Sequence, residues 1–407
     1  MVIKPFPIQR FDIGSLFYHN TCKFETQKRE ETMPEKVYFI DFTANSRENL
    51  PDKLARLLTA AGLEERIKEN DLAAVKLHFG EQGNTAFIRP PYIRKIVERV
   101  GKAGAKPFLT DTNTLYAGAR SDAPSHIRTA VENGFAFASM DGAPVIIADG
   151  LRGQSSVAVA VDQKNCSHVH IGAEITAADA IVSAAHFKGH ELTGFGGSLK
   201  NIGMGCASRK GKLDQHSTVS PKIKRKRCQG CEECLRHCPA GAISMNDEKA
   251  SILQDHCIGC GECIVRCQFK AVTIQWNQTI PVFLEKMMEY TMGALKNKEE
   301  KALFINFITD ISPACDCLPY NDAPIVRDIG IVASTDPVAI DQASVDLVNA
   351  EEALPGTCLA TNRDRGQDKF TGLYPKVAWA LQLEYAEQIG LGSRRYELVT
   401  LDTLTWR

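Results

Sequence analysis

From residue 37 onward, short apolar runs alternate with longer segments in which apolar side chains recur at helical spacing. Residues 37–42 form the first apolar run, and Leu54, Leu57 and Leu58 mark an apolar face within residues 50–67. The same pattern predicts further strands at residues 72–79, 107–110, 145–148, 168–171, 180–185, 303–307, 329–333 and 396–401. It predicts further helices at residues 91–100, 125–133, 336–348 and 373–390. This alternation predicts an α/β fold with a mainly parallel sheet covered by helices.

The predicted strands and helices are interrupted at residues 221–276. The simplest organisation is one α/β domain, made of residues 33–220 and 277–407, into which a smaller α+β domain is inserted. Two separate α/β domains flanking the insertion are the alternative. Residues 1–32 are polar and irregular, and they are expected to form a flexible N-terminal extension before Met33.

Eight cysteines within the interruption form two successive C-x2-C-x2-C-x3-C motifs. This spacing is typical of bacterial ferredoxins that carry two [4Fe–4S] clusters, in which the fourth cysteine of each motif ligates the other cluster. Zinc knuckles use fewer ligands, and a disulfide framework is expected in a small secreted chain. The motifs therefore predict a ferredoxin-like domain with one cluster on Cys228, Cys231, Cys234 and Cys267, and a second on Cys238, Cys257, Cys260 and Cys263.

Composition restricts the setting in which this protein works. The chain has 407 residues, of which 44% are hydrophobic and 24% charged, and its net charge is −1. Such a balance gives no general attraction to nucleic acid or to membranes, and no apolar run has the length of a bilayer-spanning helix. Fourteen cysteines point to a reducing compartment, so we expect a cytoplasmic protein.

Polar residues follow several of the predicted strands. Lys76 and His78 follow one, Asp111 and Arg120 follow another, and residues 186–206 follow a third. Ligands of parallel sheets bind beyond the carboxyl ends of the strands, so a site is expected where these segments meet.

The segment 186–206 is dense in glycine and also carries His190 and Lys200. Glycines let backbone N–H groups approach an anion or a cofactor, and a desolvated lysine can act as a nucleophile. A plain connecting loop with solvated side chains is the alternative. The segment predicts a cofactor site at Gly194, Gly196, Gly197 and Lys200, and catalytic roles for Lys200, His190 and His216.

The sequence Cys315-Asp316-Cys317 places two thiols one residue apart. On an extended backbone the two side chains would point to the same side, where they could share a metal, form a redox disulfide or contact a cluster. Two buried small side chains are the alternative. Cys206 is a candidate third ligand, so an additional metal ion of unknown identity is possible at Cys315, Cys317 and Cys206.

A basic run at residues 222–227 directly precedes the first cluster cysteine. A solvated linker explains it, and so does a rim that offsets the negative cluster or guides an acidic redox partner. A redox protein or a small molecule is therefore the expected partner, and neither nucleic acid nor a membrane is expected.

Three stretches together resemble a family of uncharacterised iron–sulfur-centre proteins, domain of unknown function family 362. They read LTGFGGSLKNIGMG, SPACDCLPYNDAPIV and DIGIVASTDPVAIDQASVDLV, and the resemblance runs from about Val37 to about Ala350. The resemblance implies an architecture, because this family has no settled activity.

A shorter stretch resembles the nickel-pincer lactate racemases. His190, Gly194, Gly197, Lys200 and His216 look like the pattern H…G-x-x-G-G…K…H of that family. The resemblance implies Lys200 as a cofactor attachment point and the two histidines as ligands or acid/base groups. Ala119 and Arg120 stand where that family has a His-Arg pair.

Three functions follow from these features. The first is electron transfer between two clusters and the glycine-rich pocket, in an iron–sulfur oxidoreductase of unknown substrate. The second is racemase-like or isomerase-like chemistry on a small carboxylate, and the third is a non-catalytic cluster-bearing scaffold or sensor. No dinucleotide fingerprint follows a strand, so neither NAD nor FAD is expected.

Overall fold

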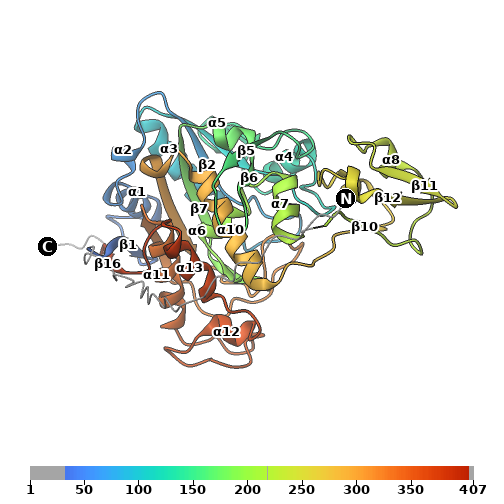
Figure 1. The fold of residues 1–407 in the computed structure, drawn as a ribbon. Helices are drawn as coiled ribbons and strands as arrows, with labels where there is room; N and C mark the ends of the chain where they lie inside the picture. The colour runs from blue at the N-terminus through green and yellow to red at the C-terminus, as the bar shows by residue number, and fades with distance from the viewer. Residues whose placement is uncertain (1–32, 218, 403–407) are drawn as a thin grey trace, which may run out of the picture. The chain divides into compact units, whose positions relative to one another are not determined.

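The computed structural model describes residues 33–217 and 219–402, so the predicted N-terminal extension lies outside the described residues. A central sheet of eight strands runs in the order β16-β1-β15-β14-β7-β2-β3-β4 (Figure 1). β15 is antiparallel to both of its neighbours, and the other neighbouring pairs are parallel. The expectation of a mainly parallel sheet in an α/β fold is confirmed. The strands are β1 (Glu35–Asp41), β2 (Leu72–Lys76), β3 (Lys106–Asp111), β4 (Val145–Ile147), β7 (Ala180–His186), β14 (Ala302–Ile308), β15 (Gly330–Ser334) and β16 (Tyr396–Thr400).

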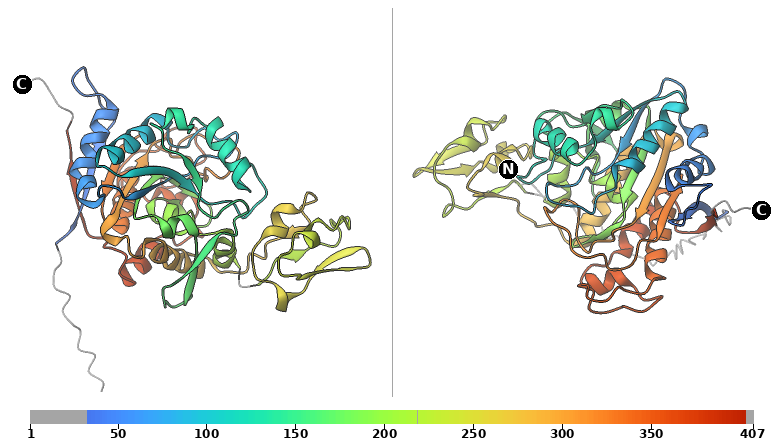
Figure 2. Two further views of the ribbon diagram at one scale, coloured as in Figure 1. Left: turned by 90° about the horizontal axis from the view of Figure 1, so that it is seen from above. Right: turned by 180° about the vertical axis from the view of Figure 1, so that it is seen from behind.

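Helices cover both faces of this sheet (Figures 1 and 2). Successive buried residues of the strands alternate between two apolar clusters, as the two-residue period of a strand requires. One cluster packs under α1 (Leu50–Ala60), α3 (Pro90–Lys102) and α4 (Ala123–Glu132). The other packs under α6 (Ser198–Gly203), α10 (Ile280–Leu295), α11 (Pro337–Asn349) and α13 (Ala380–Gln388). Strands from before and after residues 221–276 lie together in this one sheet.

Several predicted elements differ in the structure. The strand at 168–171 is part of β6 (His168–Gly172), which pairs with β5 (Ser156–Ala160) in a hairpin outside the central sheet. The helix predicted at 50–67 is divided into α1 and α2 (Leu63–Arg66), because the chain turns at Gly62 with a φ of 86°. The helix at 373–390 is shortened to α13, and α12 (Lys369–Leu373) precedes it.

The sequence pattern missed α10, a helix that lies in the second layer against α6 and α13. Most of its residues are buried, including polar ones such as Glu289 and Lys286. A helix surrounded by protein lacks the polar stripe by which amphipathic helices are recognised. The short elements α5 (Ala173–Ala177), β8 (Lys188–His190), β9 (Gly194–Gly196), α7 (Arg209–His216), η1 (Phe137–Ser139) and η3 (Glu299–Lys301) complete this part of the chain.

Residues 219–276 form a small folded segment beside α7 (Figures 1 and 2). Its elements are β10 (Lys222–Ile223), α8 (Glu233–Arg236), β11 (Ile243–Asn246), β12 (Lys249–Ile252), η2 (Gln254–His256), α9 (Glu262–Arg266) and β13 (Val272–Thr273). The two cysteine motifs occupy equivalent places, because α8 contains Cys234 and α9 contains Cys263. Within the described ranges, no helix has both the length and the apolar character needed to cross a membrane.

Candidate functional site

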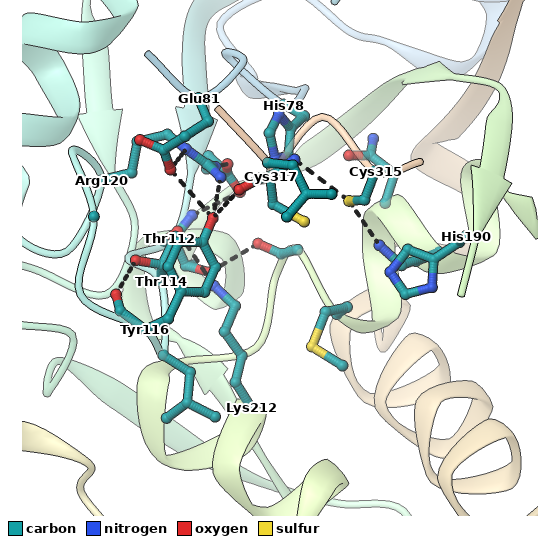
Figure 3. A pocket seen from close by; sticks show the side chains of 18 of the residues that line it. His78, Glu81, Thr112, Thr114, Tyr116, Arg120, His190, Lys212, Cys315 and Cys317 are labelled. Atoms are coloured by element: carbon teal, nitrogen blue, oxygen red, sulfur yellow. Dashed lines mark hydrogen bonds and ion pairs between the residues drawn. The ribbon is translucent and has the colours of Figure 1, made fainter. Parts of the chain in front are cut away.

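A cavity of about 560 Å³ opens beyond the carboxyl ends of β2, β3, β7 and β14, which are parallel to one another (Figure 3). This is the edge at which open α/β sheets bind ligands. Five cationic side chains line it: Lys76, Arg120, Lys188, Lys200 and Lys212. Three carboxylates face them: Glu81, Asp111 and Glu191. The excess of positive charge favours an anionic ligand.

Cys315 and Cys317 both line this cavity (Figure 3). They lie in a turn that is closed by a 3.0 Å hydrogen bond from Leu318 N–H to the Cys315 carbonyl. The backbone N–H of Cys317 also donates to Cys315 Sγ at 3.5 Å. The extended conformation assumed from the sequence is therefore wrong, and the turn itself brings the two thiols together.

Asp316, between the two cysteines, anchors this turn. Its carboxylate lies 2.9 Å from His186 Nδ1 and 3.4 Å from Lys188 Nζ. Burial alone would raise the pKa of Asp316, but His186 and Lys188 hold it well below its usual range. His186 Nε2 lies 2.8 Å from the Thr309 carbonyl, so both ring nitrogens face acceptors. The ionised Asp316 thus fixes the turn from behind while both thiols face the cavity.

Lys200 extends from α6 toward the same thiols, with its Nζ 3.7 Å from Cys315 Sγ. Burial opposes a charge on Lys200, but Cys315 and Cys317 raise its pKa above the ordinary lysine value. It is therefore an ammonium group here, and not the neutral amine that a nucleophile requires. The hydrogen bond from the Cys317 thiol, aided by Lys200 and His190, holds the pKa of Cys315 well below that of a free thiol despite burial.

In the glycine-rich segment 186–206, backbone N–H groups donate to a side chain of the same chain. The N–H groups of Ser198 and Leu199 donate to the Asp341 carboxylate at 2.8 and 3.0 Å. A Cβ on Gly197 would lie 2.3 Å from Asp341 Oδ1, so glycine is needed for this approach. Gly194 has a φ of 76° and lies against Trp379, and Gly196 lies close to the Lys200 side chain. Burial raises the pKa of Asp341 to about 6, although its hydrogen bonds oppose the rise.

Besides His186, three histidines line the cavity, and they differ in their surroundings. His190 Nδ1 accepts a hydrogen bond from Leu192 N–H at 3.1 Å, so in the neutral ring Nε2 carries the proton. His78 Nδ1 accepts from Gly80 N–H at 3.0 Å in the same way. His216 stacks on the ring of Phe283 with centroids 4.7 Å apart, and burial lowers its pKa to about 3. His190, His216 and Lys200 therefore line one cavity.

Lys212 and Tyr116 were not singled out from the sequence, whereas Arg120 was expected at this site. Lys212 on α7 donates to the carbonyl of Asn113 at 2.7 Å, and burial lowers its pKa to about 8. Arg120 lies 3.2 Å from Glu81 and 3.4 Å from Asp111, and its guanidinium donates to the Tyr116 hydroxyl at 2.7 Å. Neither Lys212 nor Tyr116 belongs to a recognisable motif, and Lys212 lies on a helix that the sequence pattern did not predict.

The eight cysteines of the small segment gather around two small cavities. One is lined by Cys228, Cys231, Cys234 and Cys267. The other is lined by Cys238, Cys257, Cys260 and Cys263. Each cavity therefore takes three cysteines from one motif and the last cysteine of the other motif.

Backbone N–H groups approach three of these sulfurs. Ala250 donates to Cys228 Sγ at 3.4 Å, and Ala242 and Ala271 donate to Cys238 and Cys267 at 3.2 Å. Such bonds stabilise thiolates, as the ligands of an iron–sulfur cluster must be. The donor set and its surroundings thus fit two four-cysteine clusters.

The second cysteine motif contacts the wall of the large cavity. A Cβ on Gly261, between Cys260 and Glu262, would lie 3.1 Å from Leu115 Cδ1, and Leu115 lines the cavity. Arg209 of α7 joins the two parts through a buried 2.8 Å ion pair with Glu262. Arg209 also donates to the Thr114 carbonyl at 3.1 Å. The loop of the second motif is therefore packed directly on the loop that follows β3.

The structure does not bring Cys206 to the Cys315–Cys317 pair. Cys206 is fully buried in the apolar cluster under α6, and it does not line the cavity. Across residues 33–217 and 219–402, no group of three or more histidine, cysteine, aspartate or glutamate side chains is arranged to hold a single metal ion.

Comparison with known proteins places the chain in a family. Residues 73–346 match the family described as "Domain of unknown function (DUF362)". A search of curated proteins finds no match. Among solved structures, the lactate racemase apoprotein from Thermoanaerobacterium thermosaccharolyticum aligns with a TM-score of 0.38 at 12% sequence identity. The alignment covers 74% of this chain and 57% of that one, so the chain spans a little over half the length of that structure. Because the family match extends over most of the sequence, this chain belongs to the DUF362 family.

Proposed function

We propose that this protein is an iron–sulfur oxidoreductase that acts on a small anionic substrate in the cavity beyond β2, β3, β7 and β14. Two [4Fe–4S] clusters would be held by the two groups of four cysteines, and when bound they would supply single electrons at low potential. The observation that carries this proposal is the close approach of Gly261 to Leu115, where a Cβ on Gly261 would lie 3.1 Å from Leu115 Cδ1, because Leu115 belongs to the cavity wall.

The roles of the chain's own residues follow from their contacts. Lys200 has no carboxylate in hydrogen-bonding contact among the described residues, so it is the cation best placed to bind an anion. Lys212 donates to the Thr112 hydroxyl and to the carbonyls of Thr112 and Asn113, so its three N–H groups already have partners. Arg120 and Lys76 are already paired with Asp111, and they shape the cavity instead. His78 and His190 each carry a hydrogen on Nε2 when the ring is neutral, so either can donate a hydrogen bond to a bound substrate.

The pairing of Arg209 with Glu262 supports the same proposal. A buried ion pair of this kind is costly to break, because separation leaves one charge without a partner in the interior. It therefore holds the second cysteine loop at a fixed distance from the cavity, and a fixed distance is what electron transfer between two sites requires.

The test is anaerobic analysis of the full chain for iron and acid-labile sulfide, followed by reduction with a strong low-potential donor. About eight irons and eight sulfides per chain, with clusters that accept electrons, are expected. Absence of iron and sulfide after reconstitution would refute the cluster assignment. Clusters that resist every low-potential donor would refute electron transfer and leave a structural or sensing role.

Acid/base chemistry on a small carboxylate is the second candidate. It is favoured by the meeting of His190, His216 and Lys200 in one cation-rich cavity. It predicts exchange of a substrate C–H proton with solvent deuterium in protein whose clusters remain oxidised. The redox proposal predicts turnover only after reduction, so the two candidates separate in one experiment.

A further inference from the structure

The cavity contains a pair of thiols for which the proposed function requires no role. Cys315 Sγ accepts from the Cys317 backbone N–H at 3.5 Å and lies 3.7 Å from the Lys200 ammonium. Both sulfurs belong to one turn and line the same cavity. A thiolate beside a thiol and a cation is the arrangement of a reactive cysteine with a second cysteine that resolves its adduct.

The rest of the turn keeps both sulfurs available. Asp316 is held on the other side by His186 and Lys188, and the Leu318 N–H closes the turn onto the Cys315 carbonyl. Both thiols therefore line the cavity, although Cys315 is only 1% exposed. A reactant must enter this cavity to reach Cys315, so bulky protein disulfides are excluded from direct attack.

We propose that Cys315 and Cys317 form a reversible dithiol–disulfide pair that reduces a small anionic disulfide bound in the cavity. Cys315 Sγ attacks one sulfur of the substrate, whose S–S bond breaks and releases one thiolate. Cys317 Sγ then attacks Cys315 Sγ, the mixed disulfide breaks, and the proton of Cys317 passes to the second departing thiolate. Two electrons move from the pair to the substrate, and a Cys315–Cys317 disulfide remains.

The choice of Cys315 as the attacking sulfur follows from its neighbours. It accepts a backbone N–H and faces the Lys200 ammonium, and both stabilise a thiolate. The choice of an anionic substrate follows from the lining of the cavity, with five cations against three carboxylates. The inference does not depend on the iron–sulfur clusters, because the two sulfurs and Lys200 belong to the α/β part of the chain.

The experiment compares two small disulfides of similar size and opposite charge, dithiodiglycolate and cystamine. The protein tested is the full-length chain with its clusters intact and with the substitutions Cys22→Ser and Cys358→Ser. The substitutions remove thiols that would compete for the reagents, and Cys358 is an exposed thiol. Each reagent's rate is divided by its rate with free cysteine, and peptide mass spectrometry follows the segment containing Cys315 and Cys317. Dithiodiglycolate is expected to convert the pair to an internal disulfide about tenfold faster than cystamine after this correction.

Variants separate the two sulfurs and the charge. Cys317→Ser should retain a stable thioglycolate adduct on Cys315, whereas Cys315→Ser should form neither an adduct nor a disulfide. Lys200→Met should remove most of the preference for the anionic reagent, while Lys210→Met, on α7 but outside the cavity lining, should preserve it. Iron content and circular dichroism identify any variant that fails to fold, and Cys317→Ala then replaces Cys317→Ser.

Three outcomes would overturn the inference. They are an adduct that persists on Cys315 when Cys317 is present, a first adduct on Cys317, and equal corrected rates for the two reagents. A protein that lacks iron but still forms the disulfide would refute the cluster proposal and leave this one standing.

Discussion

The backbone N–H of Ser198 donates to the Asp341 carboxylate at 2.8 Å, deep between α6 and α11. A loop rich in glycine, followed by a short helix, would be expected to hold an external anion. In this protein the anion is a side chain of the same chain, contributed from more than a hundred residues away. The glycines of residues 194–197 therefore shape the cavity wall, and the charge that faces a ligand comes from Lys200.

Asp341→Asn should destabilise the protein by about 1–3 kcal/mol, because the amide that replaces Oδ2 would face the Leu199 N–H and leave that donor unpaired. Chemical denaturation of the variant and the parent measures the difference. Asp346→Asn, an exposed position on the same helix, is the matched control and should change stability much less. Equal stability of the parent and Asp341→Asn would show that the carboxylate does not hold the loop.

The sheet, the helices α1, α3, α4 and α11, and the place of the cavity at the ends of β2, β3 and β7 could be predicted from local pattern. The apolar runs are strong there, and polar residues such as Lys76 and Asp111 directly follow them. α10 could not be predicted, since a helix that is buried over most of its length has no polar stripe. Contacts such as Ser198–Asp341 and Gly261–Leu115 join residues far apart in sequence, and no periodicity encodes them.

Glu262→Gln should weaken the attachment of the small folded segment, residues 219–276, to the α/β part of the chain. The substitution leaves Arg209 buried without a carboxylate, which costs about 3–5 kcal/mol where a buried pair is broken. Glu233 precedes a cysteine on α8 as Glu262 does on α9, but its side chain is 36% exposed against 2%. Hydrogen–deuterium exchange should therefore rise around Leu115 and α9 in Glu262→Gln and stay near the parent level in Glu233→Gln.

Gly261→Ala tests whether the second cysteine loop must approach the cavity wall closely. Gly259 and Gly261 have φ values of 71° and 70°, so alanine causes similar backbone strain at either position. A Cβ at Gly259 meets nothing within 4 Å, whereas one at Gly261 lies 3.1 Å from Leu115 and 3.2 Å from Arg209. Gly261→Ala should therefore lose about 1 kcal/mol more stability than Gly259→Ala, measured by denaturant titration. Identical losses would mean that the contact with Leu115 has no energetic weight.

His216→Phe should make stability less sensitive to acid. Burial, with His190 and Lys200 nearby, lowers the pKa of His216 to about 3 in the folded protein, below the ordinary value of 6.5. The unfolded chain therefore binds a proton that the folded protein refuses, and stability falls as pH drops from 6.5 toward 3. Between pH 7.5 and 5.5 the parent should lose on the order of 1 kcal/mol more than His216→Phe, whose ring can still stack on Phe283. If the free energy of unfolding fell equally with pH in both proteins, the pKa of His216 would be the same in the folded and unfolded chains, contrary to this prediction.

Paired cysteine variants can determine which thiols share a cluster. Cys238 belongs to the first motif in sequence, yet it lines the same cavity as Cys257, Cys260 and Cys263. Cys238→Ala combined with Cys257→Ala should therefore damage one cluster and retain about four irons per chain, while Cys238→Ala combined with Cys231→Ala should damage both. Assignment by sequence order predicts the reverse, because Cys231 and Cys238 would then ligate the same cluster. Iron and sulfide analysis of anaerobically prepared protein, with electron paramagnetic resonance of the reduced samples, distinguishes the two patterns, and the α/β fold of each variant can be verified by circular dichroism.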